Sequence, residues 1–140
     1  MHNLLALVTL ATLLLFLWMA VRVSGARTKF DVPAPATTGH PEFERHFRVQ
    51  ANTLEGLVVF LPSLWLLSLT LDSLLASRLG DLIAAALGVV WIAGRVIYMQ
   101  SYVKDPSTRS AGFGIQALAT MIALVGGVLV VAWALVKGGL

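Results

Sequence analysis

Four stretches of this sequence are apolar over lengths that approach the thickness of a lipid bilayer. The first carries no charge from Leu4 to Val21, and the last carries none from Ala111 to Val136. A helix of about 20 apolar residues crosses the hydrocarbon core. Only 12% of the residues are charged and 58% are hydrophobic, whereas soluble domains carry about 25% charged residues. We therefore expect an all-α integral membrane protein.

The apolar stretches predict four transmembrane helices in an up-down bundle, over residues of about 3–22, 41–71, 82–104 and 106–136. Between the first two, residues 22–39 read as a polar connection that contains Pro33 and Pro35. Asp105 and Pro106 are typical of a helix start, with an N-cap followed by proline. A signal peptide is the alternative for the first stretch, but no basic residue precedes it and it is longer than a usual signal-peptide apolar region.

Basic residues gather in the two connections that such a bundle places at the same end. One group is Arg22, Arg27, Lys29, Arg45 and Arg48, and the other is Lys104 and Arg109, against Arg78 and Lys137 at the opposite end. Cytoplasmic loops are enriched in Lys and Arg, so we expect these connections in the cytoplasm and both termini outside. The compact loops and the absence of a C-terminal retention signal favour a bacterial inner membrane.

Several kinds of site are not expected from this composition. The chain has no cysteine, which excludes disulfides and cysteine-based metal sites. Any thiol chemistry must therefore use a thiol of the substrate. No metal is expected, because His40 and His46 do not fit a metal-ligand spacing. The basic residues lie in loops rather than in one dense patch, so nucleic acid is not an expected partner.

Two polar sets each occupy one helical face near the expected cytoplasmic end. In the second span the set is Arg48, Asn52 and Glu55, and in the third it is Arg95, Tyr98 and Tyr102. Their spacings of i, i+4, i+7 and i, i+3, i+7 place each set on a single face. Glu55 lies at the mouth of an apolar segment, where an ionisable group is costly and is a functional candidate. The alternative is that Glu55 pairs with Arg95 to hold two helices together.

Arg109 lies near the start of the fourth predicted helix. An arginine beside a helix N-terminus favours a thiolate over a thiol, although Arg109 also fits a simple topology-setting charge. Together with the two polar sets it offers cations for carboxylates, a carboxylate for an ammonium group, and phenols and an amide for hydrogen bonds. This combination suits a small zwitterionic, peptide-like ligand.

The run Glu44-Arg45-x-x-Arg48-x-x-x-Asn52-x-x-Glu55, with Arg95-x-x-Tyr98-x-x-x-Tyr102 and Arg109, resembles the MAPEG family of membrane-associated proteins in eicosanoid and glutathione metabolism. The similarity is to leukotriene-C synthase and the microsomal glutathione transferases. It covers roughly Val23 to Ala111 and includes TTG-x-PEFER at residues 37–45. The resemblance implies one domain over residues 1–140, assembled as a homotrimer of four-helix subunits, with glutathione bound between neighbours at the cytoplasmic side.

The resemblance also implies an activity and a role for each matched residue. The expected activity is conjugation of glutathione, the co-substrate, to hydrophobic electrophiles, and reduction of lipid hydroperoxides stays open beside it. Arg109 matches the arginine that activates the thiol. Glutathione would be held by Arg48, Asn52, Glu55, Tyr98 and Tyr102 of one subunit and by Arg27 and Gln50 of its neighbour. Structural roles are expected for Arg95, Glu44 and Arg45. The electrophile would arrive through the bilayer, along the first and last helices.

Two departures from the family pattern bear on the reaction. Thr28 stands where leukotriene synthases have a second arginine, and Gly56 replaces a tyrosine of their glutathione site. Both favour a more general transferase or peroxidase.

The alternative function is lipid binding without catalysis, as in the five-lipoxygenase-activating protein of similar fold. That protein lacks the arginines matched by Arg48 and Arg109 and has aspartate at the position of Glu55, so these three residues favour an enzyme.

Overall fold

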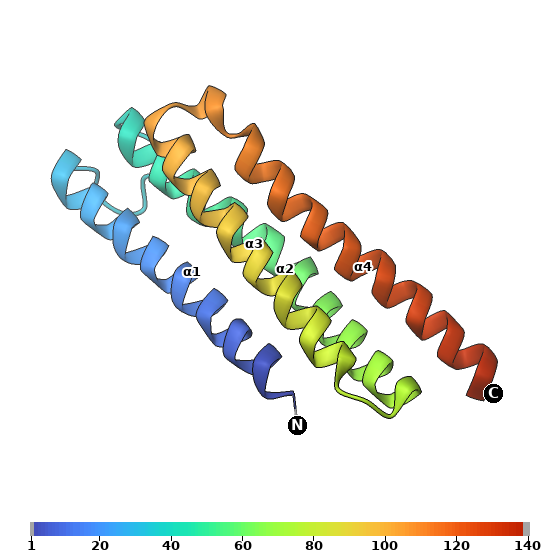
Figure 1. The fold of residues 1–140 in the computed structure, drawn as a ribbon. Coiled ribbons are helices and arrows are strands. Elements are labelled where there is room, and N and C mark those ends of the chain that lie inside the picture. The colour runs from blue at the N-terminus through green and yellow to red at the C-terminus, as the bar shows by residue number, and fades with distance from the viewer. Residues whose placement is uncertain (1, 139–140) are drawn as a thin grey trace.

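The computed structural model describes residues 2–138, which form four long helices and one short 3-10 turn. The elements are α1 (Asn3–Phe30), α2 (Pro41–Leu75), α3 (Leu79–Lys104), η1 (Pro106–Thr108) and α4 (Ser110–Gly138). Each of the four long helices is long and apolar enough to cross a membrane, where the fourth candidate span consists of η1 and α4 together. They lie side by side in an up-down bundle, with both chain ends at the same end of the molecule (Figure 1). The predicted all-α architecture with four membrane-length helices is confirmed.

Helix α1 is longer than the apolar stretch that predicted it. It continues through Arg22 to Phe30, where a polar connection was expected. The physical reason is that the segment contains no proline before Pro33, so nothing breaks the helix when it leaves the apolar layer. It ends at Asp31, whose φ of 52° is left-handed, and the basic residues of this segment therefore lie on a projecting helix end.

The start of α2 carries recognisable N-terminal chemistry. The side chain of His40 accepts a hydrogen bond from the Glu42 amide at 3.2 Å, and Pro41 occupies the first helical position, where its missing N–H costs nothing. The His40 ring also stacks on Phe30 at 3.7 Å between ring centroids. These contacts join the end of α1 to the start of α2. From there α2 continues without interruption through Pro62.

The core of the bundle lies where α2, α3 and α4 pack together. Phe60 of α2 stacks on Trp91 of α3 at 4.9 Å between centroids. The same apolar cluster contains Leu57, Leu64, Ala84, Ala119 and Ala123, together with Leu5 of α1. Helix α1 packs on α2 and α3. The outer faces of α1 and α4 are strongly apolar, as shown by Leu14 (65% exposed) and Val136 (79% exposed). Such faces suit hydrocarbon rather than water.

Two contacts fix the geometry at opposite ends of the bundle. At the end with the termini, the buried Asp81 of α3 accepts a hydrogen bond from the Leu5 amide of α1 at 2.9 Å. At the other end, Gly112 lets α4 approach α3 closely. A Cβ at Gly112 would lie 2.6 Å from the Cα of Tyr98 and 2.8 Å from the carbonyl oxygen of Gly94. This close packing sets the separation of the helices that carry the polar residues.

Candidate functional site

A cavity of about 420 Å³ opens between α2, α3 and the start of α4, at the end of the bundle opposite the termini. Its walls carry polar and aromatic side chains from all three helices: Arg48, Asn52, Tyr98, Tyr102, Ser107, Arg109, Ser110 and Phe113. Four of these residues belong to the two polar sets that the sequence singled out, and Arg109 is a fifth predicted site residue. Segments far apart in the chain therefore bring their polar residues to one place.

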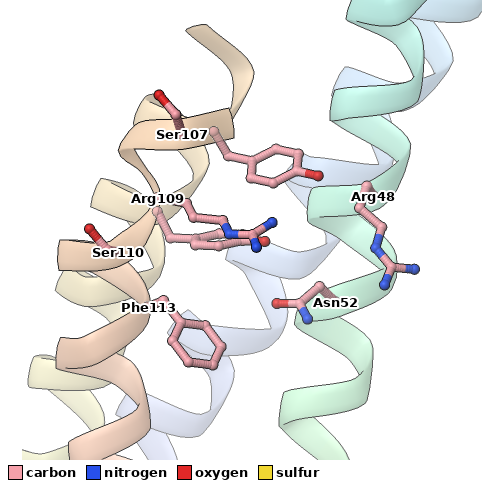
Figure 2. Close-up of a pocket in the computed structure, with 8 residues that line it drawn as sticks. Arg48, Asn52, Ser107, Arg109, Ser110 and Phe113 are labelled. Atoms are coloured by element: carbon pink, nitrogen blue, oxygen red, sulfur yellow. The ribbon is translucent and has the colours of Figure 1, made fainter. Parts of the chain in front are cut away.

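Arg109 joins η1 to α4, and its carbonyl is the acceptor of a hydrogen bond from the first turn of α4. Its carbonyl accepts from the Phe113 amide at 3.1 Å, so its side chain leaves the backbone at the helix N-terminus. The guanidinium carbon lies 5.9 Å from the Tyr102 ring centroid. Figure 2 shows Arg109 and Phe113 extending from α4 toward Asn52 on α2. An anion in the cavity would meet both a guanidinium and a helix N-terminus.

The two tyrosines of α3 form a stacked wall. Tyr98 and Tyr102 lie 5.4 Å apart between ring centroids, with an angle of 26° between their planes. Tyr98 is buried, and the guanidinium carbon of Arg95 lies 4.8 Å from its ring centroid. The stack therefore separates two cations, with Arg95 fully buried at one end and Arg109 exposed at the other.

Arg95 binds Asn52 and does not pair with Glu55. Its two terminal nitrogens donate to Asn52 Oδ1 at 3.0 and 3.1 Å, and one of them also donates to the Asn52 carbonyl at 3.0 Å. The Asn52 amide in turn donates to Glu55 Oε2 at 3.4 Å. Over residues 2–138 no salt bridge joins Arg95 to Glu55. Glu55 is exposed at the surface of the chain.

The remaining predicted residues lie around the cavity or away from it. Arg27 donates through Nη1 to the carbonyls of Val32 (3.3 Å) and Ala36 (2.7 Å), so it organises its own loop. The half-buried Gln50 does not line the cavity. Glu44 accepts from the Gly39 amide at 3.0 Å.

Arg45 acts on the end of α3. Its Nη1 donates to the carbonyls of Val103 at 3.1 Å and Lys104 at 3.0 Å. Helix C-termini leave such carbonyls without intrahelical partners. Arg45 therefore ties α2 to the last turn of α3, directly beside the cavity.

Three lining residues were absent from the sequence prediction: Ser107, Ser110 and Phe113. Phe113 follows Arg109 by four residues, and this spacing places both on one helical face, so periodicity alone could have found it. The hydroxyls of Ser107 and Ser110 point away from the gap between α4 and α2 in Figure 2. Arg48 and Tyr102 also line a second cavity of about 420 Å³ that extends toward the loop before α2.

The connection that presents Arg109 is held by Asp105. Its carboxylate accepts a hydrogen bond from the Ser107 amide at 2.9 Å, as expected for the cap of a helical turn. Hydrogen bonds from the Ser107 backbone and then its side chain lower the pKa of Asp105 below its ordinary value of 3.8. Asp105 is therefore ionised at neutral pH and fixes η1.

Among the residues that the structure describes, no group of three His, Asp or Glu side chains is arranged to hold a metal ion.

The fold and cavity together define a class: a four-helix membrane bundle with an arginine-rich and tyrosine-rich cavity at one end. The sequence model of the MAPEG family matches residues 5–129, and the chain belongs to this family. It is an integral, multi-pass membrane protein.

Individual proteins are similar over most of the chain. An uncharacterised protein of Synechocystis sp. is 42% identical over 93% of this chain and 89% of its own length. Human microsomal glutathione S-transferase 2 is 36% identical, with 78% of this chain and 71% of the human protein covered. Bovine leukotriene C4 synthase is 37% identical, with coverage of 77% and 67%.

Proposed function

We propose that this protein is an integral-membrane glutathione S-transferase that conjugates glutathione to hydrophobic electrophiles, with Arg109 stabilising the thiolate. The observation that carries the proposal is the position of Arg109 at the start of α4, facing a cavity that Asn52 and the two tyrosines complete. The names of the two characterised relatives, a glutathione S-transferase and a leukotriene C4 synthase, support the same class of reaction.

The chemical step needs a thiolate at neutral pH. A free thiol has a pKa of about 8.5, and lowering it by two units requires about 2.7 kcal/mol of differential interaction. The Arg109 guanidinium and the α4 N-terminus both favour the anion. The thiolate sulfur then forms a bond to the electrophilic carbon, while the leaving group departs with its electron pair or an epoxide C–O bond opens. The thiol proton is released to solvent.

Peptide binding follows from the charges at the cavity. Arg48 offers a guanidinium for a carboxylate of glutathione, and Glu55 offers a carboxylate for its ammonium group. Asn52, Tyr98 and Tyr102 supply hydrogen-bonding groups. Arg27 and Gln50 would act from the neighbouring subunit. The loop contacts of Arg27 use only Nη1.

The assembly we propose is a homotrimer, with the site between neighbours. Its support is the exposure of Glu55 beside Leu54 (51% exposed) and Val58 (68% exposed). A carboxylate among lipid-facing side chains is costly, and a neighbouring subunit would cover it. The charge bias of the connections supports a site that faces the cytoplasm, with the termini on the other side. The membrane we propose is a bacterial inner membrane.

The same thiolate would support a peroxidase reaction as a second activity. Its sulfur would attack the outer oxygen of a lipid hydroperoxide, and a second glutathione would complete the reduction. Two glutathiones are then oxidised to the disulfide, and the hydroperoxide becomes an alcohol and water. Thr28 and Gly56, where leukotriene synthases have arginine and tyrosine, support such a general role over the specific leukotriene reaction.

A conjugation assay tests the proposal. The purified protein in detergent is given glutathione and chlorodinitrobenzene, and product formation is compared with that of Arg109→Ala and Arg109→Lys. We expect conjugation by the wild type, a loss of about 100-fold or more for Arg109→Ala, and partial retention by Arg109→Lys. Arg78→Ala, at the opposite end, serves as the control. Wild-type activity that Arg109→Ala leaves unchanged would refute the role of Arg109. If the wild type conjugated glutathione to none of several tested electrophiles, the proposed transferase activity would be refuted.

A further inference from the structure

A second polar groove lies outside the candidate site, between α1 and α3 at the same end of the bundle. Its volume is about 240 Å³, and it is lined by Trp18, Arg22, Met99, Gln100, Val103 and Lys104. None of these residues lines the cavity around Arg109. In Figure 1 the two helices run next to each other along this side. The groove is therefore a separate feature.

The groove lies at the boundary of the apolar layer. Arg22 directly follows the uncharged stretch that ends at Val21, and Lys104 is the last residue of α3. Trp18 is 44% exposed, and the Arg22 guanidinium carbon lies 5.2 Å from its ring centroid. Tryptophan and basic residues at this depth are typical of the headgroup region. Each helix therefore contributes one cation to the mouth of the groove.

Both cations lack an acidic partner. Over residues 2–138 neither Arg22 nor Lys104 takes part in a salt bridge. The adjacent Asp105 is engaged with the Ser107 amide. The last carbonyls of α3, which would repel an anion, are covered by hydrogen bonds from Arg45. The groove therefore carries two cations that no salt bridge engages within the described residues.

The part of the groove that lies farther from its charged mouth, toward the apolar layer, is apolar. Met99 is buried and Val103 half-buried on its α3 side. Leu14 lies one turn from Trp18 on the same face of α1 and is 65% exposed. If a phospholipid placed its phosphate at the mouth, its acyl chains would lie along this apolar surface of the helices. A free phosphate ion would contact only the charged mouth. A phospholipid would contact the mouth with its headgroup and the apolar part with its acyl chains.

We propose that this groove binds the phosphate headgroup of an anionic phospholipid, with Arg22 and Lys104 contacting the phosphate and Gln100 hydrogen-bonding to the headgroup. Basic pockets between transmembrane helices on the cytoplasmic side are suited to such lipids. A simple topology-setting role would account for the two cations, but not for their arrangement with an exposed amide and an indole around one groove. The bound lipid bridges α1 to α3.

The test is a lipid titration followed by native mass spectrometry of the full-length protein in detergent, with phosphatidylglycerol and phosphatidylcholine compared. We expect the wild type to retain phosphatidylglycerol preferentially, and Arg22→Gln/Lys104→Gln to bind it about tenfold more weakly. Arg22→Lys/Lys104→Arg keeps both charges and should keep the preference. Arg78→Gln/Lys137→Gln removes the same charge at the opposite end and should also keep it.

Three results would overturn the proposal. The first is equal retention of phosphatidylglycerol by the wild type and Arg22→Gln/Lys104→Gln. The second is an equal loss in Arg78→Gln/Lys137→Gln, since that would indicate a general charge effect. The third is complete displacement of the lipid by millimolar inorganic phosphate, which would assign the site to the free ion. None of these results depends on glutathione chemistry.

Discussion

Arg95 of α3 holds Asn52 of α2 by three hydrogen bonds from its guanidinium, two to the side-chain oxygen and one to the backbone carbonyl. Because Arg95 is fully buried, these bonds form away from bulk water, where a geometric mismatch is costly. They orient the Asn52 amide, which donates to Glu55. Arg95 thus acts on the proposed peptide site through Asn52.

Replacing Arg95 by lysine tests this positioning role. Lysine keeps the charge but cannot reproduce the planar fork that reaches both Asn52 oxygens. We expect glutathione affinity to fall by about tenfold, the equivalent of one charged hydrogen bond, as measured by isothermal titration calorimetry. The Asn52→Ala variant provides the second arm of a double-mutant cycle, and Arg95→Lys should add little to it. Fully additive losses would show that Arg95 acts independently of Asn52.

Gly112 is predicted to control how closely α4 packs on α3. Gly112→Ala would press a methyl group against the backbone at Tyr98 and Gly94, and overpacking of this kind costs about 1–3 kcal/mol. We expect a lower midpoint of thermal unfolding, followed by circular dichroism, and reduced conjugation activity. Gly114→Ala is the matched control, because a Cβ there meets no atom within 4 Å. Equal behaviour of the two variants would contradict this packing role.

Phe113 is predicted to set the preference for the hydrophobic electrophile. It lines the cavity beside Arg109 and is 49% exposed, so it offers apolar surface close to the proposed thiolate. Phe113→Ala should raise KM for a bulky apolar electrophile about tenfold and leave glutathione affinity unchanged. Phe113→Leu should keep most of the wild-type value. A matching loss of glutathione affinity would place Phe113 in the peptide site instead.

The connection that carries Arg109 should be sensitive to acid. The pKa of Asp105 is lowered in the folded protein by its hydrogen bonds to Ser107. The capping interaction therefore contributes stability above the ordinary value of 3.8, and this contribution is lost as pH falls through the lower folded value. The Ser107 amide chemical shift should report this titration by NMR. In Asp105→Asn the amide shift should not titrate over this range. A titration at or above the ordinary value would contradict the hydrogen-bonded cap.

Periodicity and direction along the chain were enough to predict that Arg48, Asn52, Tyr102 and Arg109 lie near one another, although Glu55 and Arg95 of the same polar sets do not line the cavity. The spacing from Arg48 to Asn52 selects one face of α2, and the up-down order of the spans brings that face to the same end as Tyr102 and Arg109. The structure places these four residues around one cavity. Such predictions succeed because helix geometry and membrane crossing leave few arrangements.

Side-chain partners and close packing were not accessible in this way. Glu55 and Asn52 both lie within helical reach of Arg95, and only the packed structure shows that the guanidinium takes Asn52. Likewise, Gly112 and Gly114 look equivalent in the sequence, yet only Gly112 packs against backbone. These distinctions depend on the rotation of each helix about its axis, which packing with neighbouring helices determines.

The most direct test of the central claim is the ultraviolet absorbance of the glutathione thiolate, recorded as glutathione is added to the detergent-purified protein near neutral pH. The account predicts a thiolate signal that saturates with glutathione and disappears in Arg109→Ala. Glutathione that binds without ionising would contradict the role of Arg109 and indicate a protein that binds the peptide without activating it. No binding at all would contradict the glutathione assignment and favour a lipid-binding function for this fold.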